Sequence, residues 1–98
     1  MTAVGLAILS SLCSTALADS GYINIEVVND SSYDQRVAVT DNICGNLVLE
    51  KRIIADGRLP AQVCARDMGR GNVTIRNLET GSERQYQGIL DGDRVQTP

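Results

Sequence analysis

The sequence predicts an all-β domain, a small antiparallel sandwich or rolled barrel of six or seven strands with one disulfide. Three observations support this fold class. Apolar and polar residues alternate in short runs that are separated by turn-forming residues. No stretch of the mature chain shows the 3.6-residue period of a long helix. The 98 residues include neither Phe nor Trp, so we expect an aliphatic core.

The N-terminal segment, residues 1–18, is predicted to be a cleavable secretory signal peptide. Its apolar run contains no charged residue and ends in Ala16-Leu17-Ala18, the small-x-small pattern that signal peptidase accepts. The run is shorter than the roughly 20 apolar residues that span a bilayer. We therefore expect no membrane span and one small exported domain over residues 19–98. It would be extracellular, or periplasmic if the source is bacterial.

Seven runs are expected to form strands in the mature chain. In order they cover residues 22–28, 35–41, 47–55, 58–66, 72–78, 84–90 and 94–96. In the first run Ile23, Ile25 and Val27 alternate with polar residues, so these three side chains should face the core. The same alternation places further aliphatic residues inward: Val37, Val39, Val73 and Ile75.

Asp56-Gly57 is the strongest hairpin signal, because both positions tolerate the positive φ angles of a type I′ turn. It predicts that residues 47–55 pair with residues 58–66, with Cys64 opposite Leu49. Cys44 would then lie roughly 17 Å beyond the partner of Cys64. A disulfide cannot span that distance. The chain must therefore fold back at residues 45–46, or the hairpin must be looser.

Other breaks in the pattern predict turns and sheet edges. Gly81 is expected in the left-handed conformation of a hairpin turn. Residues 91–92 should form a tight turn, and residues 67–71 a flexible connection. Pro60 lacks an amide hydrogen, which makes its run an edge strand. The runs 22–28 and 84–90 would be better edges for pairing with a partner strand.

Signal cleavage removes Cys13 and leaves Cys44 and Cys64 as a pair. In an oxidising compartment, two cysteines of a small domain usually form a disulfide. Closing this loop should stabilise the fold by roughly 3 kcal/mol. The alternative is a pair of free, buried thiols.

The residue inventory argues against catalysis. The chain has no His, which removes the commonest general base and the usual neutral metal ligand. Oxidised cysteines supply no thiol nucleophile. Asp91 and Asp93 are interpreted as solvated acids beside a turn. The net charge of -3 disfavours nucleic acid as a partner. We therefore expect no enzyme, no metal site and no cofactor.

Cations are concentrated in residues 58–76, where only Asp67 offsets them: Arg58, Arg66, Arg70 and Arg76. Arg70 lies between two glycines, where backbone amides could help to form an anion-binding nest. This region could bind a phosphate, a sulfated glycan or an acidic patch on a partner. The alternative is that these arginines are solvated and pair with carboxylates on neighbouring strands.

Tyr86 and two glycosylation sequons complete the candidate sites. Tyr is enriched at binding hot spots, although a half-buried strand Tyr is equally usual. Asn29-Asp30-Ser31 and Asn72-Val73-Thr74 are acceptors for N-glycosylation in a eukaryotic secretory pathway.

The signal ending in Ala16-Leu17-Ala18, about six short strands and one disulfide (Cys44 and Cys64) occur together in a mature chain of about 80 residues. In this combination the chain resembles small secreted effectors of plant-pathogenic fungi, particularly the MAX type. The resemblance covers the whole mature chain and rests on architecture, without a sequence motif. It implies a six-stranded β-sandwich that binds host or receptor proteins, often by edge-strand pairing, and is not an enzyme. The family's disulfide usually begins near the first strand, whereas Cys44 follows the second, and no binding residue is carried over.

We therefore expect a secreted, non-enzymatic binding protein, and specifically an effector that engages a host protein. Two other classes remain open. One is a structural or envelope-associated component of a bacterium. The other is an inhibitor of a secreted enzyme, for which residues 67–71 are the best candidate for an exposed, rigid loop.

Overall fold

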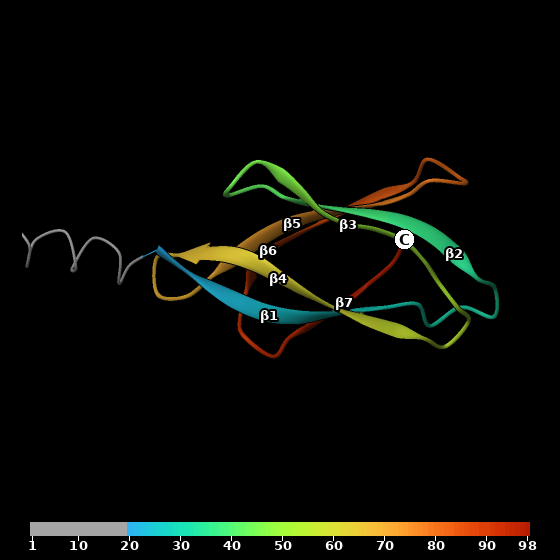
Figure 1. Cartoon of the computed structure of the whole chain (residues 1–98), viewed down its shortest axis with the longest axis horizontal. Coiled ribbons are helices and arrows are strands. Elements are labelled where there is room, and N and C mark those ends of the chain that lie inside the picture. The colour runs from blue at the N-terminus through green and yellow to red at the C-terminus, as the bar shows by residue number, and fades with distance from the viewer. Residues whose placement is uncertain (1–19) are drawn as a thin grey trace, which may run out of the picture.

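The computed structural model describes residues 20–98, which form a two-layered β-sandwich (Figure 1). Its seven strands are β1 (Ser20–Val28), β2 (Gln35–Asp41), β3 (Asn46–Ile53), β4 (Arg58–Arg66), β5 (Gly71–Asn77), β6 (Glu83–Ile89) and β7 (Arg94–Gln96). One sheet has the order β4-β1-β7, and the other has the order β3-β2-β5-β6. The predicted all-β fold is confirmed, as a sandwich. The predicted signal peptide lies outside the described residues, among which no helix has the length and apolar character needed to span a membrane.

Each predicted run coincides with one strand, and no boundary differs by more than two residues. The expected inward residues are buried, as in β1, where Ile23, Ile25 and Val27 face the second sheet. Both layers contribute aliphatic side chains to one core: Ile23, Ile25, Val27, Val37, Val39, Ile53, Ala61, Val63, Ala65, Val73, Ile75, Ile89 and Val95. Side-chain alternation located the strands because each sheet buries only one face.

The predicted β3–β4 hairpin is wrong. Asp56 does take the left-handed conformation, with φ 58°, and the Gly57 amide donates to the Ile54 carbonyl at 2.8 Å. This turn, however, carries the chain from one layer to the other, because β3 pairs with β2 and β4 pairs with β1. Turn chemistry specifies a chain reversal but not the partner strand. Here β4 pairs with β1 along the full length of both strands, from Ser20↔Arg66 to Val28↔Arg58.

Two of the three predicted edges are confirmed. β4, which contains Pro60, and β6 each lie at the edge of a sheet. The prediction for β1 is wrong, because β1 lies between β4 and β7. β7 joins β1 in parallel, from Glu26↔Arg94 to Val28↔Gln96. This contact joins the two ends of the described chain, so no local pattern in β1 could reveal it.

The remaining turns are well defined. Gly81 has φ 81° in the β5–β6 hairpin, as predicted. Asp93 N–H donates to the Leu90 carbonyl at 3.0 Å, closing the tight turn expected at residues 91–92. The segment 67–71 is a closed turn, because Arg66 and Arg70 exchange two backbone hydrogen bonds of 3.0 and 2.9 Å.

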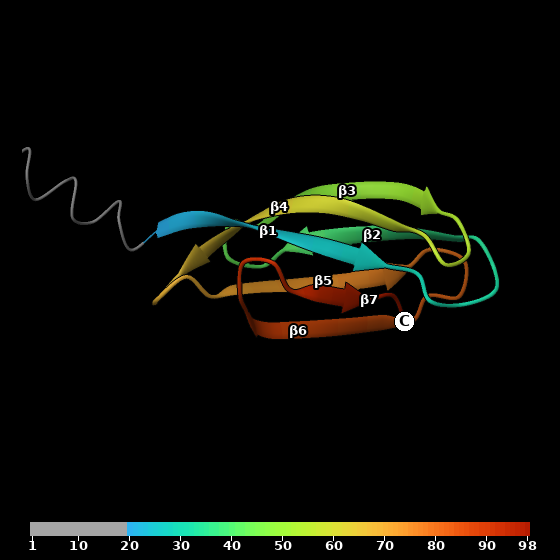
Figure 2. The same ribbon diagram turned by 90° about the horizontal axis from the view of Figure 1, so that it is seen from below.

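The strands run between two ends of the sandwich, both visible in Figure 2. The turns of residues 42–45 and 67–70 lie at one end, which we call the disulfide end. The connections of residues 29–34 and 54–57 lie at the other, which we call the Asn29 end.

Candidate functional site

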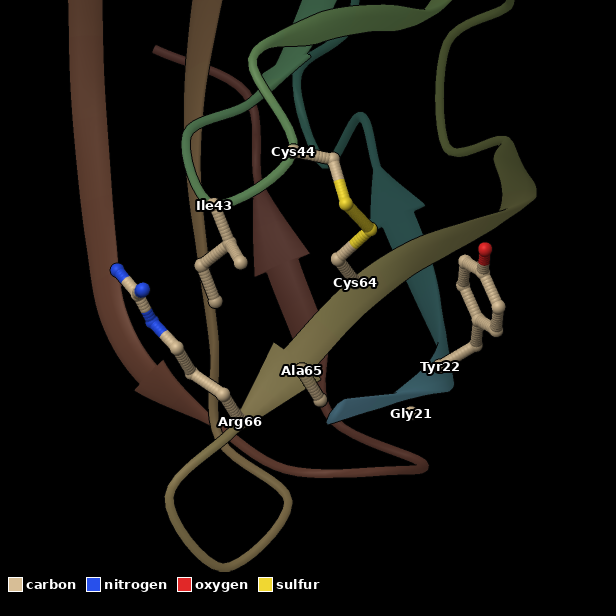
Figure 3. Close-up of a pocket in the computed structure, with 7 residues that line it drawn as sticks. All are labelled: Gly21, Tyr22, Ile43, Cys44, Cys64, Ala65 and Arg66. Carbon is tan, nitrogen blue, oxygen red and sulfur yellow. A yellow bond between two sulfur atoms is a disulfide. The ribbon is translucent and has the colours of Figure 1, made fainter. Parts of the chain in front are cut away.

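The disulfide predicted between Cys44 and Cys64 is present and joins the two sheets. Cys44 lies in the β2–β3 turn, with its Cα 6.0 Å from that of Cys64 in β4. This contact resolves the distance conflict in the sequence prediction, because β3 does not pair with β4. Cys64 lies opposite the exposed Tyr22 on the outer face of its sheet. The β2–β3 turn therefore reaches around the free edge of β4 (Figure 3).

Asp41, which the sequence analysis gave no role, holds the same turn from inside. Its side chain is buried. One carboxylate oxygen accepts the amide hydrogens of Ile43 and Cys44, at 3.0 and 3.1 Å. The other accepts that of Cys64 at 2.7 Å. An Asp at the end of a strand, directly before a turn, is the sequence signal that could have revealed this arrangement.

Asp41, Cys44 and Cys64 place three possible metal ligands within 4.8 Å of one another. Each sulfur is bonded to the other, so neither is a thiolate. The carboxylate oxygens already accept three backbone amides. The cluster is therefore a structural clamp, which holds the β2–β3 turn against β4.

A hollow of about 350 Å³ lies beside this clamp (Figure 3). The disulfide forms one wall, and Tyr22, Ile43 and Ala65 contribute further apolar surface. Tyr22 is 70% exposed. The hollow offers a small apolar contact surface next to an aromatic side chain.

A second hollow, of about 240 Å³, shares Ile43 and Arg66 with the first and extends to Arg70 and Gly88. Gly88 has φ 66° at a β-bulge, where the β5–β6 register shifts by one residue. A Cβ atom at Gly88 would lie 3.9 Å from Arg70 Nη1. The bulge therefore brings β6 close to a guanidinium group.

The structure divides the predicted arginine group. Arg66 and Arg70 both line the second hollow, and neither forms an ion pair within residues 20–98. Arg58 contacts Glu26 at 3.5 Å near the other end of β4, and Arg76 contacts Glu83 at 3.8 Å. Arg70 does not offer the suggested nest, because its amide donates to the Arg66 carbonyl. Two of the four arginines thus remain together as a candidate anion site.

Tyr86 is engaged within the fold. Its partly buried side chain lies in β6, and its hydroxyl donates to the Gln96 carbonyl at 2.8 Å. The same oxygen accepts the Gln96 amide hydrogen at 3.1 Å. Arg84 Nη1 also donates to it, at 3.2 Å, and this hydrogen bond raises the pKa of Arg84. Tyr86 therefore attaches β7 to β6 through its hydroxyl.

Asp91 and Asp93 also have roles within the fold. Asp91 Oδ1 accepts the Asn24 amide at 2.8 Å, and Asp93 Oδ2 accepts the Leu90 amide at 2.9 Å. These carboxylates organise the β6–β7 turn and its contact with β1.

The two sequons differ sharply in accessibility. Asn29 is fully buried, and its Nδ2 donates to the carbonyls of Tyr33, Ile53 and Ile54 at 2.7–3.1 Å. A glycan on this nitrogen is incompatible with the fold. Asn72 is only partly buried, and its Oδ1 accepts hydrogen bonds from Asn42 and Gln85.

The free edge of β4 is largely blocked. The amides of Cys64 and Arg66 point away from β1, since they donate to Asp41 and Arg70. Backbone groups alternate in direction along a strand, so Pro60 and Gln62 have the same orientation. Pro60 has no amide hydrogen. Gln62 is therefore the one interior position of this edge with an amide hydrogen left to offer.

The free edge of β6 is open. At the hairpin, Asn77 N–H donates to the Ser82 carbonyl at 2.8 Å. By alternation, the backbones of Glu83, Gln85 and Gln87 point away from β5. These outward groups have no backbone partner within residues 20–98. In Figure 2 the strand runs along the border of the molecule.

Comparisons of this chain with protein-family models, curated proteins and solved structures find no match. The resemblance to fungal effectors therefore stays a prediction based on architecture.

Proposed function

We propose that residues 19–98 form a secreted, non-enzymatic protein that binds another protein, with β6 as the binding edge. The observation that carries this proposal is the contrast between the blocked edge of β4 and the open edge of β6. An extended segment of a partner can add to such an edge through backbone hydrogen bonds, and its side chains then provide specificity.

The specific role that we propose is an effector that engages a host protein. The predicted signal peptide and the disulfide are compatible with an extracellular protein. The architectural resemblance to secreted effectors that pair through edge strands favours this role over that of an envelope component.

Several features support a binding role in preference to catalysis. The chain contains no His. The two cysteines of the described chain are joined to each other. Asp91 and Asp93, the acids considered as a catalytic pair, each accept a backbone amide, Asp91 from Asn24 in β1 and Asp93 from Leu90 in the β6–β7 turn.

The turn of residues 67–69 is the feature that bears on an inhibitor role. It is closed by two backbone hydrogen bonds and exposes 88% of Met68. Its residues all have positive φ, from 52° at Asp67 to 78° at Gly69. Such a backbone cannot lie extended in an enzyme cleft, as a strand-like substrate does. The turn therefore favours the inhibitor role less than the open edge favours strand addition.

A capture experiment tests the proposal. Purified residues 19–98 would be used as bait in extracts of the host and of the organism's own envelope. Gln85→Pro removes an outward amide hydrogen from β6, and Gln62→Pro makes the matched change on β4. We expect wild type and Gln62→Pro to retain one stoichiometric host protein that Gln85→Pro loses.

Other outcomes are equally informative, provided that thermal unfolding shows both variants to be folded. Recovery of envelope components alone would favour the structural role. Equal capture by Gln85→Pro would place the binding surface elsewhere and overturn the proposed use of β6.

A further inference from the structure

We infer that the β6 edge also pairs with β6 of a second copy, forming a weak two-fold dimer with a continuous sheet across both molecules. This inference rests on the proposed use of β6 as a pairing edge. It names one occupant of that edge, and a partner strand would have to displace it.

The backbone of β6 suits a two-fold antiparallel ladder. In such a ladder Gln85 lies opposite Gln85 of the second copy, and Glu83 lies opposite Gln87. All three residues direct their amide and carbonyl groups outward. Each can therefore donate and accept one hydrogen bond across the dimer axis.

The side chains are compatible in this register. On the outer face, the neutral amides of Gln85 meet at the axis, and Glu83 faces the neutral Gln87. On the inner face, Arg84 lies opposite Tyr86 of the second copy, where a guanidinium group can contact an aromatic ring. In this register no two like charges lie directly opposite each other. Such pairs would destabilise the ladder.

Neighbouring registers are less favourable. A two-residue shift toward the start of β6 places Arg84 opposite Arg84, and a further shift places Glu83 opposite Glu83. A shift in the other direction brings the bulge at Gly88 into the ladder. The charges and the bulge therefore select a single register.

The other edge of the same sheet, β3, is less suited to pairing with a second copy. β3 has a register shift at Val48 and three consecutive charged residues, Glu50, Lys51 and Arg52. Bulges and charges of this kind discourage pairing of exposed edges. β4 is blocked as well, and β7, the remaining edge, has only three residues. β6 is therefore the edge best suited to self-pairing.

The dimer should be weak, since only residues 83–87 of each copy overlap. Such an interface falls below the roughly 1,000 Å² typical of specific complexes. We expect a dissociation constant of about 0.1–1 mM. Exchange between dimer and monomer would then leave the edge accessible to a partner of higher affinity.

Sedimentation velocity from about 10 µM to 1 mM tests the inference, because that range brackets the expected dissociation constant. Gln85→Glu and Gln85→Lys each place like charges at the axis, so each variant should dimerise at least tenfold more weakly than wild type. An equimolar mixture of the two should recover dimer, because opposite charges then meet. Gln62→Glu and Gln62→Lys make the same changes on the exposed face of β4 and should behave as wild type.

Amide hydrogen exchange adds a residue-level readout. Protection of Glu83, Gln85 and Gln87 should rise with protein concentration in wild type but not in Gln85→Glu. A wild-type chain that stays monomeric at about 1 mM would overturn the inference, as would a dimer that neither charge variant weakens.

The capture experiment separates this inference from the proposed function. A monomeric wild type that still captures a host protein overturns the dimer alone. A dimer that captures nothing supports self-pairing and overturns the proposed function.

Discussion

The two ends of the sandwich solve the same problem with opposite chemistry. At each end a buried side chain completes the hydrogen bonding of backbone groups in and beside the turns. At the Asn29 end, the side-chain amide of Asn29 donates to three carbonyls. At the disulfide end, the carboxylate of Asp41 accepts three amides. Buried backbone groups must be paired. A carbonyl without a backbone partner therefore requires a donor side chain such as Asn29, and an amide requires an acceptor side chain such as Asp41.

The two ends also differ in whether a covalent bond reinforces them. No covalent link reinforces the Asn29 end, whereas the disulfide end has the Cys44–Cys64 bond in addition to Asp41. The covalently held end carries both hollows, together with Arg66 and Arg70, neither of which forms an ion pair in the described chain. Covalent closure can hold a turn without filling the space beneath it. This end is thus better suited to present a contact surface.

The largest expected effect follows from reversing the chemistry at the Asn29 end. Asn29→Asp would place a buried carboxylate against three carbonyl oxygens, so the free energy of unfolding should fall by about 3–5 kcal/mol. Urea denaturation would measure this loss. Gln62→Glu adds the same charge at an exposed position and should change stability little. A loss for Asn29→Asp close to that of the control would contradict the role assigned to Asn29.

Reduction of the disulfide should have the next largest effect. Removing the cross-link should cost roughly 3 kcal/mol, which corresponds to a fall of about 12–24 °C in the thermal midpoint of a domain of this size. Because Asp41 still holds the turn, the reduced protein should remain folded at room temperature. Calorimetry with and without a reductant tests both statements. An unchanged thermal midpoint would mean that the disulfide does not stabilise the fold.

Asp41→Asn should destabilise the oxidised protein by about 1–3 kcal/mol, because an amide group cannot accept all three hydrogen bonds. Asp30→Asn removes an exposed carboxylate and serves as the control. Since Asp41 and the disulfide hold the same turn, their effects should not be additive. Measuring Asp41→Asn in oxidised and reduced protein would reveal this coupling, and simple additivity would count against a shared clamp.

The smallest expected effect concerns the arginines at the disulfide end. Arg70→Ala should weaken binding of a polyanion such as heparin severalfold, because Arg70 forms no ion pair in the described chain. Arg36 contacts Glu50 at 3.9 Å, so Arg36→Ala should have less effect. Equal effects, measured by heparin affinity at fixed salt concentration, would show that the arginines act as independent solvated charges.

The candidate site was less predictable than the fold. The two cysteines could be paired from their number and the expected compartment. The group of four arginines, in contrast, divided between distant parts of the molecule, because Arg58 and Arg66 occupy opposite ends of one nine-residue strand. Asp41 was missed because its role depends on Cys64, which lies in another sheet.

The sequence by itself determined where the strands lie, which faces they bury and where the chain turns. These properties depend on neighbouring residues, through side-chain alternation and turn chemistry. Only the tertiary structure decided that β4 pairs with β1, that β7 joins β1, and that β6 has an open edge. Strand partners are selected by burial and hydrogen bonding across the whole domain, and those energies are not encoded in any single segment.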